Sequence, residues 1–348
     1  MRVLFDIVHP ADVLFFHHPI LKLREKGHTV AIASRERDIT TTVLDRLGHA
    51  HQPLSVAGSG APHFMFELAR RDAAMLRLAR EFKPDVLAGF GGVSISHVGK
   101  LLGIPSLSFY DTEIAYLQLL VTLPFITEWH VPNSYTGRVP RGRTYRFAGP
   151  ARLSYFHPRN FKPDRSRAIG AGLDPDRPNF LVRTVAWSSN HDLGKRGWST
   201  EQLRKLVSKL SALGRVHISA EGGVAPEFEV LRYSGDVLDL HHLMAHCRAY
   251  VGESATMAAE AAILGVPAIY GIGDYRGYVA ELAEKGLVQP SDGTIENMIE
   301  LIEEALDRDP QHWLLMRAKA LAEWIDVSDY VVSAIERHGW RPNRPRVD

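Results

Sequence analysis

Short apolar runs alternate with segments of helical periodicity along the first half of the chain. The segments 14–27 and 65–82 lie between such runs, and each is long enough to be a crossover helix. Strand, helix and strand at this spacing predict a parallel sheet with helices on its faces. The expected strands are 3–8, 30–34, 86–88, 106–109 and 129–131.

The same alternation of apolar runs and helical segments begins again in the second half of the chain. The pattern predicts an α/β fold of two doubly wound, parallel-sheet domains, which 348 residues can accommodate at about 100–200 residues per domain. The tail 341–348 is rich in Pro and Arg, and we expect it to be disordered. The expected strands of this half are 180–185, 216–219, 250–251 and 268–270, and the expected helices are 200–213, 294–308, 312–325 and 327–338.

The composition limits which binding partners and which cellular compartment we expect for the protein. Hydrophobic residues make up 45% of the chain and the net charge is +1, so nothing in the bulk numbers attracts nucleic acid. Cys247 is alone and can form neither an intrachain disulfide nor a thiolate metal cage, which fits a reducing compartment. The first apolar run is too short for a signal peptide core or a membrane span. We therefore expect a cytoplasmic protein that does not bind nucleic acid.

Residues 137–167 carry nine Arg or Lys residues and one acidic residue, Asp164. We interpret this stretch, which also contains several prolines, as a solvated linker between the domains. A surface that faces phosphates or anionic lipid is the alternative. If a substrate of the protein is a lipid, peripheral membrane contact would come from residues 138–146 or from the aromatic side chains of residues 122–129.

An alanine-rich helix follows the strand at 250–251 and keeps a single carboxylate. Ser254 is suited to cap this helix, so that the N–H groups of Ala255 and Thr256 point out of its positive end towards a diphosphate. Glu260 lies one turn after Thr256 on the same face, where a ribose diol could donate to it. A glutamate on a solvent-facing stripe is the alternative. The candidate donor loop consists of Gly252, Glu253, Ser254, Ala255, Thr256 and Glu260.

Two further loops at predicted strand ends carry candidate donor-binding groups. The loop 186–198 is longer and more polar than a turn requires, and the loop 219–228 holds a Gly-Gly pair that lets a ligand approach the backbone. Ordinary surface loops are the alternative for both. The candidates in these loops are Ser188, Asn190, His191, Glu221 and Gly222.

The first strand does not lead into G-x-G-x-x-G, which argues against a nicotinamide dinucleotide. His9 and Asp12 stand at this strand end instead, where a general base would sit. Simple capping of the following helix is the alternative. Glu113 directly follows a later strand and is the third candidate for the base.

We expect no cofactor, because a nucleotide sugar would be a substrate. We also expect no metal site. His242 and His246 are four residues apart, but no third ligand completes a zinc site. The D-P-D at 174–176 lies in a turn flanked by proline.

Five blocks of the chain carry a resemblance: 6–16, 111–113, 155–164, 182–197 and 252–269. Together they resemble domain-of-unknown-function family 354, prokaryotic proteins grouped with the two-domain sugar-nucleotide fold called GT-B. The resemblance covers almost the whole chain. The last block is also similar to the donor loop of the N-acetylglucosaminyltransferase that makes lipid II and of the UDP-N-acetylglucosamine 2-epimerases. In those enzymes a glutamate of this helix binds ribose, and Glu260 falls on that position.

The chain departs from the family pattern at two places. Asp12 and Leu14 stand where the family commonly carries histidines, so a histidine's role does not carry over to them, whereas His9 matches. Ala255 replaces the second glycine of a G-E-S-G-T pattern, which narrows the backbone geometry at the helix start and keeps its N–H groups.

The resemblance implies two Rossmann-like domains facing a cleft, with the donor held by the second domain and the acceptor and base supplied by the first. It also implies that no metal is required and that the last helix crosses back onto the first domain. The expected parts are an acceptor domain at 1–155, a donor domain at 156–326, the crossing helix at 327–340 and the tail at 341–348.

We therefore expect a metal-independent glycosyltransferase of carbohydrate biosynthesis. Its donor would be a nucleotide-diphosphate sugar, UDP-linked by the resemblance, and its acceptor a carbohydrate, a lipid or another small molecule. An epimerase of the UDP-N-acetylglucosamine 2-epimerase type is the first alternative. It is less favoured because epimerases carry a carboxylate where this chain reads G-F-G-G-V-S at 89–94, although Glu113 and Glu128 could serve as others. A non-catalytic nucleotide-sugar binder is the second alternative.

Overall fold

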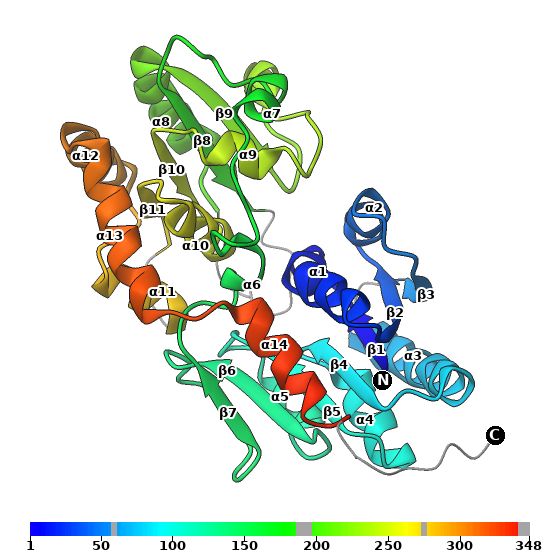
Figure 1. The fold of residues 1–348 in the computed structure, drawn as a ribbon. Helices are drawn as coiled ribbons and strands as arrows, with labels where there is room; N and C mark the ends of the chain where they lie inside the picture. The colour runs from blue at the N-terminus through cyan, green and yellow to red at the C-terminus, as the bar shows by residue number, and fades with distance from the viewer. Residues whose placement is uncertain (57–60, 186–196, 273–276, 340–348) are drawn as a thin grey trace. The chain divides into compact units, whose positions relative to one another are not determined.

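The computed structural model describes residues 1–56, 61–185, 197–272 and 277–339 (Figure 1). The chain divides into two compact units, and each is described by itself. Unit 1 consists of Met1–Asn160 and Ile325–Asp348, and unit 2 consists of Phe161–Trp324. Across the described ranges, no helix combines the length and the apolar character needed to cross a membrane.

Unit 1 is built on a seven-stranded sheet. Its strands are β1 (Arg2–Ile7), β2 (Thr29–Glu36), β3 (Gln52–Val56), β4 (Val86–Phe90), β5 (Ser106–Phe109), β6 (Glu128–Pro132) and β7 (Thr144–Phe147). Its helices are α1 (Pro10–Glu25), α2 (Thr40–Arg46), α3 (Ala61–Phe82), α4 (Val93–Leu102), α5 (Tyr116–Thr122), α6 (Leu153–Phe156) and α14 (Val327–Glu336). The strands pair in parallel in the order β3-β2-β1-β4-β5-β6-β7.

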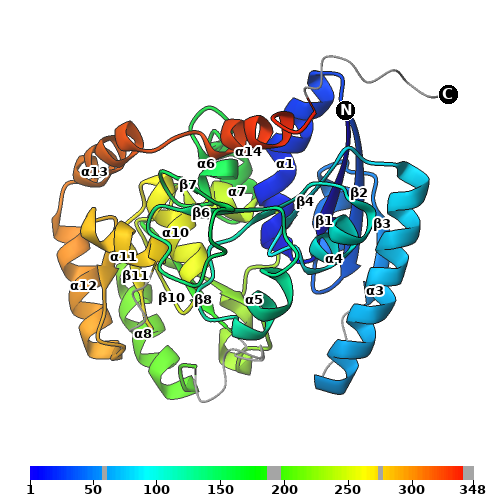
Figure 2. The same ribbon diagram turned by 90° about the horizontal axis from the view of Figure 1, so that it is seen from below.

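The strand order of unit 1 reverses between β1 and β4, which makes this the topological switch point of the sheet. α1 and α3 lie on opposite faces of the sheet (Figure 2). The central strands β1 and β4 are therefore buried along most of their length, which is why each reads as a nearly continuous apolar run.

Aromatic side chains fix α1 against the sheet. Phe15 and Phe16 of α1 are buried, and their ring centroids lie 5.5 Å from Phe109 and 5.0 Å from Phe5, respectively. Removing a buried aromatic side chain of this size costs about 3–5 kcal/mol. This packing also fixes the turn from β1 into α1, where two of the candidate site residues lie.

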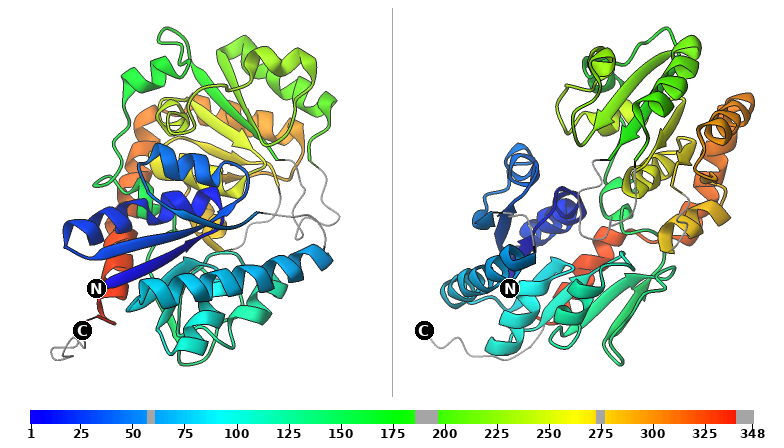
Figure 3. Two further views of the ribbon diagram at one scale, coloured as in Figure 1. Left: turned by 90° about the vertical axis from the view of Figure 1, so that its right-hand side faces the viewer. Right: turned by 180° about the vertical axis from the view of Figure 1, so that it is seen from behind.

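The C-terminal helix α14 belongs to unit 1 and packs on α1 and α6 (Figure 3). The Tyr330 hydroxyl donates to Nδ1 of the buried His130 at 2.7 Å, and His130 Nε2 donates to Glu128 at 2.9 Å. Lys22 of α1 forms an ion pair of 2.7 Å with Asp329. Polar contacts as well as apolar packing therefore tie the end of the chain to its beginning.

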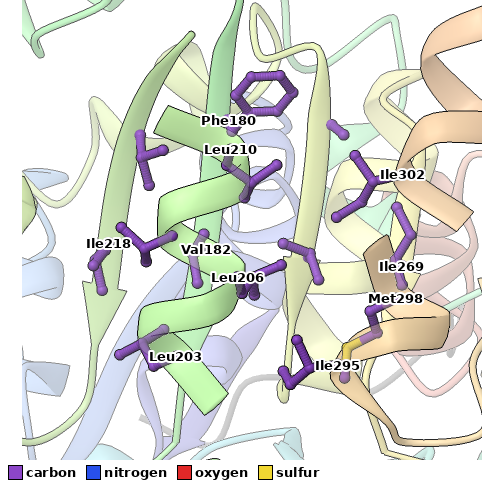
Figure 4. Close-up of a cluster of buried hydrophobic side chains, with 14 of the residues drawn as sticks. Phe180, Val182, Leu203, Leu206, Leu210, Ile218, Ile269, Ile295, Met298 and Ile302 are labelled. Carbon is purple, nitrogen blue, oxygen red and sulfur yellow. The ribbon is translucent and has the colours of Figure 1, made fainter. Parts of the chain in front are cut away.

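Unit 2 has a five-stranded parallel sheet of order β12-β11-β10-β8-β9. Its strands are β8 (Asn179–Thr184), β9 (Arg215–Ala220), β10 (Ala249–Gly252), β11 (Ala268–Tyr270) and β12 (Val288–Pro290). Its helices are α7 (Arg165–Gly170), α8 (Thr200–Leu213), the 3-10 helix η1 (Pro226–Leu231), α9 (Leu240–Met244), α10 (Ala255–Leu264), α11 (Gly277–Glu284), α12 (Ile295–Asp307) and α13 (Pro310–Glu323). Val182 and Ile269 of the sheet meet Leu206 of α8 and Met298 of α12 in a buried core (Figure 4).

The structure confirms the predicted α/β class with two parallel sheets, and it adds three strands that the sequence pattern did not predict. These strands, β3, β7 and β12, are edge strands of their sheets. Each has residues exposed to solvent, so its sequence lacks a continuous apolar run. β7 and α6 fall within residues 137–167, so that stretch is mostly part of unit 1 and the interpretation as a solvated linker was wrong for it.

Candidate functional site

The N-terminus of α10 in unit 2 presents unused backbone donors at the end of β10. Ser254 caps the helix, with its hydroxyl accepting from the Met257 N–H at 3.3 Å. The N–H groups of Ala255 and Thr256 then have no intrahelical acceptor, because they belong to the first turn. Together with the positive end of the helix dipole, they form a place where an anion is stabilised.

Gly252 ends β10, and its lack of a side chain lets β10 and β8 approach each other. A Cβ atom at this position would lie 2.6 Å from Arg183 Cβ and 2.9 Å from the Arg183 carbonyl oxygen. Gly252 and Arg183 are register partners in the parallel ladder. The glycine therefore brings the Arg183 side chain to the strand end that leads into α10.

Glu260 is buried in the second turn of α10, with 3% of its surface exposed. The alternative of a solvent-facing glutamate is therefore wrong. His241 of α9 donates from Nε2 to Glu260 Oε2 at 2.9 Å. Sequence reasoning missed His241, because only the tertiary fold brings α9 to α10.

Glu253 has a different environment from the rest of the predicted donor loop. Its carboxylate is 3% exposed and accepts from the Val185 N–H at 3.0 Å and from the Trp198 N–H at 2.7 Å. These two residues stand on either side of 186–196, so Glu253 holds together the chain ends that lead into that segment. The predicted donor-binding residues Ser188, Asn190 and His191 lie in it and are outside the described residues.

Arg183 is a cation of this region that sequence reasoning missed. It donates to Ser219 Oγ at 2.8 Å and to Glu221 Oε1 at 2.5 Å, so the predicted Glu221 is placed beside it. Gly222 follows Glu221 directly and is half-buried. An arginine that ends an otherwise apolar strand was the available signal, because a charge at the carboxyl end of a parallel strand faces the ligand side of such a sheet.

In unit 1, His9 and Asp12 cap α1 reciprocally. The Ala11 N–H donates to His9 Nδ1 at 3.2 Å, and Asp12 Oδ2 accepts from the N–H groups of His9 at 3.0 Å and Val8 at 3.2 Å. His9 is exposed, whereas Asp12 is 4% exposed. Both candidates for the base thus also have the capping role that was the alternative.

Burial raises the pKa of the Asp12 carboxyl from 3.8 to about 7, against the opposing effects of the Val8 N–H and the Arg152 guanidinium. A carboxyl group with a pKa near 7 can both hold and release a proton at neutral pH, which is the property required of a general base. Capping and proton transfer are compatible here, because the two N–H groups orient the carboxylate without neutralising it.

Arg152 joins Asp12 to a second buried carboxyl group, Asp111, at the end of β5. Arg152 lies 3.5 Å from Asp111 Oδ2, and its guanidinium stands 5.6 Å from the centre of the Phe90 ring. Burial raises the pKa of Asp111, and Arg152 opposes that rise. Sequence reasoning missed Arg152, because it is one of many arginines in residues 137–167. The predicted Glu113 is half-buried nearby in the chain and accepts from the Thr136 N–H at 3.5 Å.

Histidines 242 and 246 were set aside as zinc ligands for lack of a third group. In the structure, His242 Nδ1 accepts from the Asp164 N–H at 2.9 Å, so this nitrogen already has a structural role. Within the described residues, no group of three or more side chains is arranged to hold a metal ion.

The structure resembles solved structures of two enzyme classes. The UDP-GlcNAc 2-epimerase of Neisseria meningitidis, solved with UDP-GlcNAc bound, aligns at TM-score 0.70 and 13% identity over 97% of this chain and 100% of that one. A putative UDP-N-acetylglucosamine 2-epimerase of Listeria monocytogenes aligns at TM-score 0.70 and 13% identity over 99% and 98% of the two chains. The spinosyn forosaminyltransferase aligns at TM-score 0.64 and 15% identity over 97% and 99%.

No protein-family model matches the chain, and a search of curated proteins gave no match. At such low identity the structural likeness shows the fold. The chain has two parallel-sheet α/β domains of the kind that GT-B glycosyltransferases and UDP-sugar epimerases share. The expected fold class is confirmed.

Proposed function

We propose that unit 2 binds a nucleotide-diphosphate sugar at the N-terminus of α10 and that the protein transfers the sugar to an acceptor hydroxyl. The observation that carries this proposal is the buried carboxylate of Glu260, one turn beyond the free N–H groups of Ala255 and Thr256. A diphosphate suits the N–H groups, and a ribose diol suits the carboxylate. The solved epimerase that holds UDP-GlcNAc has the same fold, so UDP is the first nucleotide to test.

Negative charge develops on the diphosphate as its bond to the anomeric carbon breaks. The α10 N–H groups and Arg183 are the groups of unit 2 that would stabilise this charge. Arg183 is held by Ser219 and Glu221, and the Glu221 side chain is 43% exposed. A phosphate oxygen would replace Glu221 as the acceptor of the Arg183 N–H.

Unit 1 would supply the base. Asp12 takes the proton of the acceptor hydroxyl while that oxygen forms a bond to the anomeric carbon and the diphosphate leaves. Its pKa of about 7 suits this task at neutral pH. His9, exposed at the same turn, is the second candidate, and Glu113 is the third. Arg152 would stabilise the ionised form of Asp12, which is the form that can accept a proton.

Epimerisation is the second candidate function, and one observation favours it. Asp12 and Asp111 are both buried, both have raised pKa values and both are influenced by Arg152. Removing a proton from a sugar carbon and returning one to its other face requires two such groups. Two buried, protonatable carboxyl groups would meet that requirement without a carboxylate at residues 89–94.

A ligand screen followed by a solvent-exchange measurement tests these functions. Thermal shift and calorimetry against UDP-, GDP-, CMP- and dTDP-sugars should identify one donor, which at 100 times its Kd adds about 2.7 kcal/mol of stability. The bound sugar is then incubated in D2O. Slow donor hydrolysis without deuterium uptake supports transfer, and deuterium at the second sugar carbon supports epimerisation. Binding with neither result identifies a non-catalytic binder, and failure to bind any nucleotide sugar refutes the proposal.

We also propose that the chain belongs to family 354, on the strength of its five sequence blocks, and that the reaction needs no metal. Helix N–H groups and an arginine can offset the charge of a diphosphate without a divalent cation. Donor hydrolysis should therefore be unchanged when EDTA is added. Loss of hydrolysis with EDTA and recovery with magnesium would contradict the proposal that the reaction needs no metal.

A further inference from the structure

Helix α5 of unit 1 carries an apolar face that is exposed to solvent. Tyr116, Leu117 and Leu120 are 70%, 73% and 62% exposed, and Phe125, just beyond the helix, is 41% exposed. We call these four side chains the apolar patch. The opposite side of α5 is anchored in the core through the buried Leu119. The patch is therefore a fixed surface, because the helix that carries it is packed on its other side.

Arginines stand beside the apolar patch. Arg143 donates to the carbonyl oxygens of Leu123 at 3.0 Å and Ile126 at 2.5 Å, which fixes the segment after β6 against the end of α5. The exposed Arg138 and Arg141 flank this contact, and we call them the arginine rim. A pocket of about 270 Å³ is lined by Leu120 of the patch and Arg138 of the rim, so the two features adjoin.

The loop that carries the arginine rim, residues 133–143, has three arginines and no acidic residue. Between residues 114 and 163 the only acidic residue is Glu128, which is buried and paired with His130. Two carboxylates from outside this stretch lie close to the surface: Glu113 accepts from the Thr136 N–H at 3.5 Å, and Asp72 is paired with His97, whose ring packs on Phe125. The exposed charge that residues 114–163 themselves contribute is positive. Apolar side chains next to exposed arginines match the interface of a bilayer, where acyl chains lie beside phosphate groups.

We propose that the apolar patch and the arginine rim dock the protein on membranes that contain anionic phospholipid. A second copy of the chain fits this surface less well. A two-fold contact would bring two arginine rims together without acidic partners from the same region. The proposal does not depend on the reaction proposed above, since it concerns where the protein binds and not what it converts.

Vesicle co-sedimentation tests the docking surface. The full-length protein should bind phosphatidylcholine vesicles that contain about 30 mol% phosphatidylglycerol, and bind pure phosphatidylcholine weakly. The double variant Leu117→Ser/Leu120→Ser should lower the partition coefficient by about tenfold or more, through loss of apolar insertion. The double variant Arg138→Gln/Arg141→Gln should lower it by about 25-fold, at about fivefold for each arginine near an anionic surface.

Matched controls separate the surface from general effects of composition. Leu315→Ser removes an apolar side chain that is 56% exposed in unit 2, and Arg77→Gln/Arg80→Gln removes two exposed arginines of α3. Both should keep parental vesicle binding. All of the replaced side chains are at the surface, so circular dichroism should show parental folding and thermal midpoints.

Three results would overturn the proposal. The first is equal binding of the parent to anionic and neutral vesicles, or no binding to either. The second is a loss of binding in the controls as large as in the patch and rim variants. The third is self-association in sedimentation velocity that Leu117→Ser/Leu120→Ser abolishes, without any vesicle binding, which would assign the patch to a second copy of the chain.

Discussion

Replacing Asp12 with asparagine should change the pH dependence of stability in a defined direction. Burial raises the pKa of Asp12 from 3.8 to about 7 in the folded protein. The folded state therefore keeps a proton that the unfolded chain releases. The resulting stabilisation is fully present below about pH 4 and is lost as the pH rises through 7. Asparagine does not titrate, and its amide oxygen can accept the same two backbone N–H groups as Asp12 Oδ2.

The size of the expected difference in stability follows from the shift in the pKa of Asp12. A displacement from 3.8 to about 7 corresponds to at most about 4 kcal/mol, at about 1.4 kcal/mol for each pKa unit. At pH 4 the parent and the Asp12→Asn variant should have similar stability, because a protonated aspartate and an asparagine have nearly the same shape and charge. By pH 8 the variant should be more stable than the parent by up to about 4 kcal/mol.

Urea unfolding of parent and variant at a series of pH values measures this difference. Pulse-labelling of amide hydrogens, read by mass spectrometry on peptides from β1 and α1, reports the unfolding of unit 1 separately from unit 2. A difference in stability that does not vary between pH 4 and pH 8 would refute the reasoning. It would show that Asp12 ionises freely in the folded protein, and the case for Asp12 as the base would lose its support.

Further changes test the remaining groups. Glu260→Gln should weaken nucleotide-sugar binding more than tenfold, about 1.4 kcal/mol, while circular dichroism stays parental, and unchanged affinity in calorimetry would refute the ribose role. Thr256→Val should weaken diphosphate ligands and leave a free nucleoside unaffected, so equal losses in calorimetry would count against the phosphate assignment. Gly252→Ala should destabilise unit 2 by about 1–3 kcal/mol in urea unfolding, because its Cβ meets the Arg183 backbone 2.9 Å away, and parental stability would contradict that account. With an acceptor identified, Asp12→Asn should cut turnover by about 10²–10⁴ at unchanged donor affinity. Parental turnover would contradict the role of Asp12 as the base, and His9→Ala and Glu113→Gln would then test the other two candidates.

Most of the fold could be predicted from the sequence because the parallel strands are buried on both faces. Such strands need apolar residues at consecutive positions, and β1, β4 and β8 show this pattern directly. The edge strands β3, β7 and β12 could not be found this way. β3 has no buried residue and β7 and β12 have one each, so none of them shows a run of apolar residues or a periodic pattern.

The candidate site shows the same division between local and long-range information. The Ser254 cap and the spacing of Thr256 and Glu260 are local, and the sequence predicted their places on the helix. His241, the partner of Glu260, and Arg152, the arginine beside Asp12, come from other parts of the sequence. No local pattern shows that His241 reaches Glu260, or which arginine of residues 137–167 approaches the end of β5.

The return of α14 to unit 1 makes unit 2 an insertion within unit 1, since the chain leaves unit 1 after Asn160 and re-enters it at Ile325. Unit 2 is continuous in sequence, so all of its residues are synthesised before the helix that completes unit 1. During synthesis, the hydrogen bond from Tyr330 to His130 can form only after the whole of unit 2 has been made. Unit 1 can therefore complete its packing only after unit 2 has been synthesised, unlike a chain in which the N-terminal domain is complete before the next one begins.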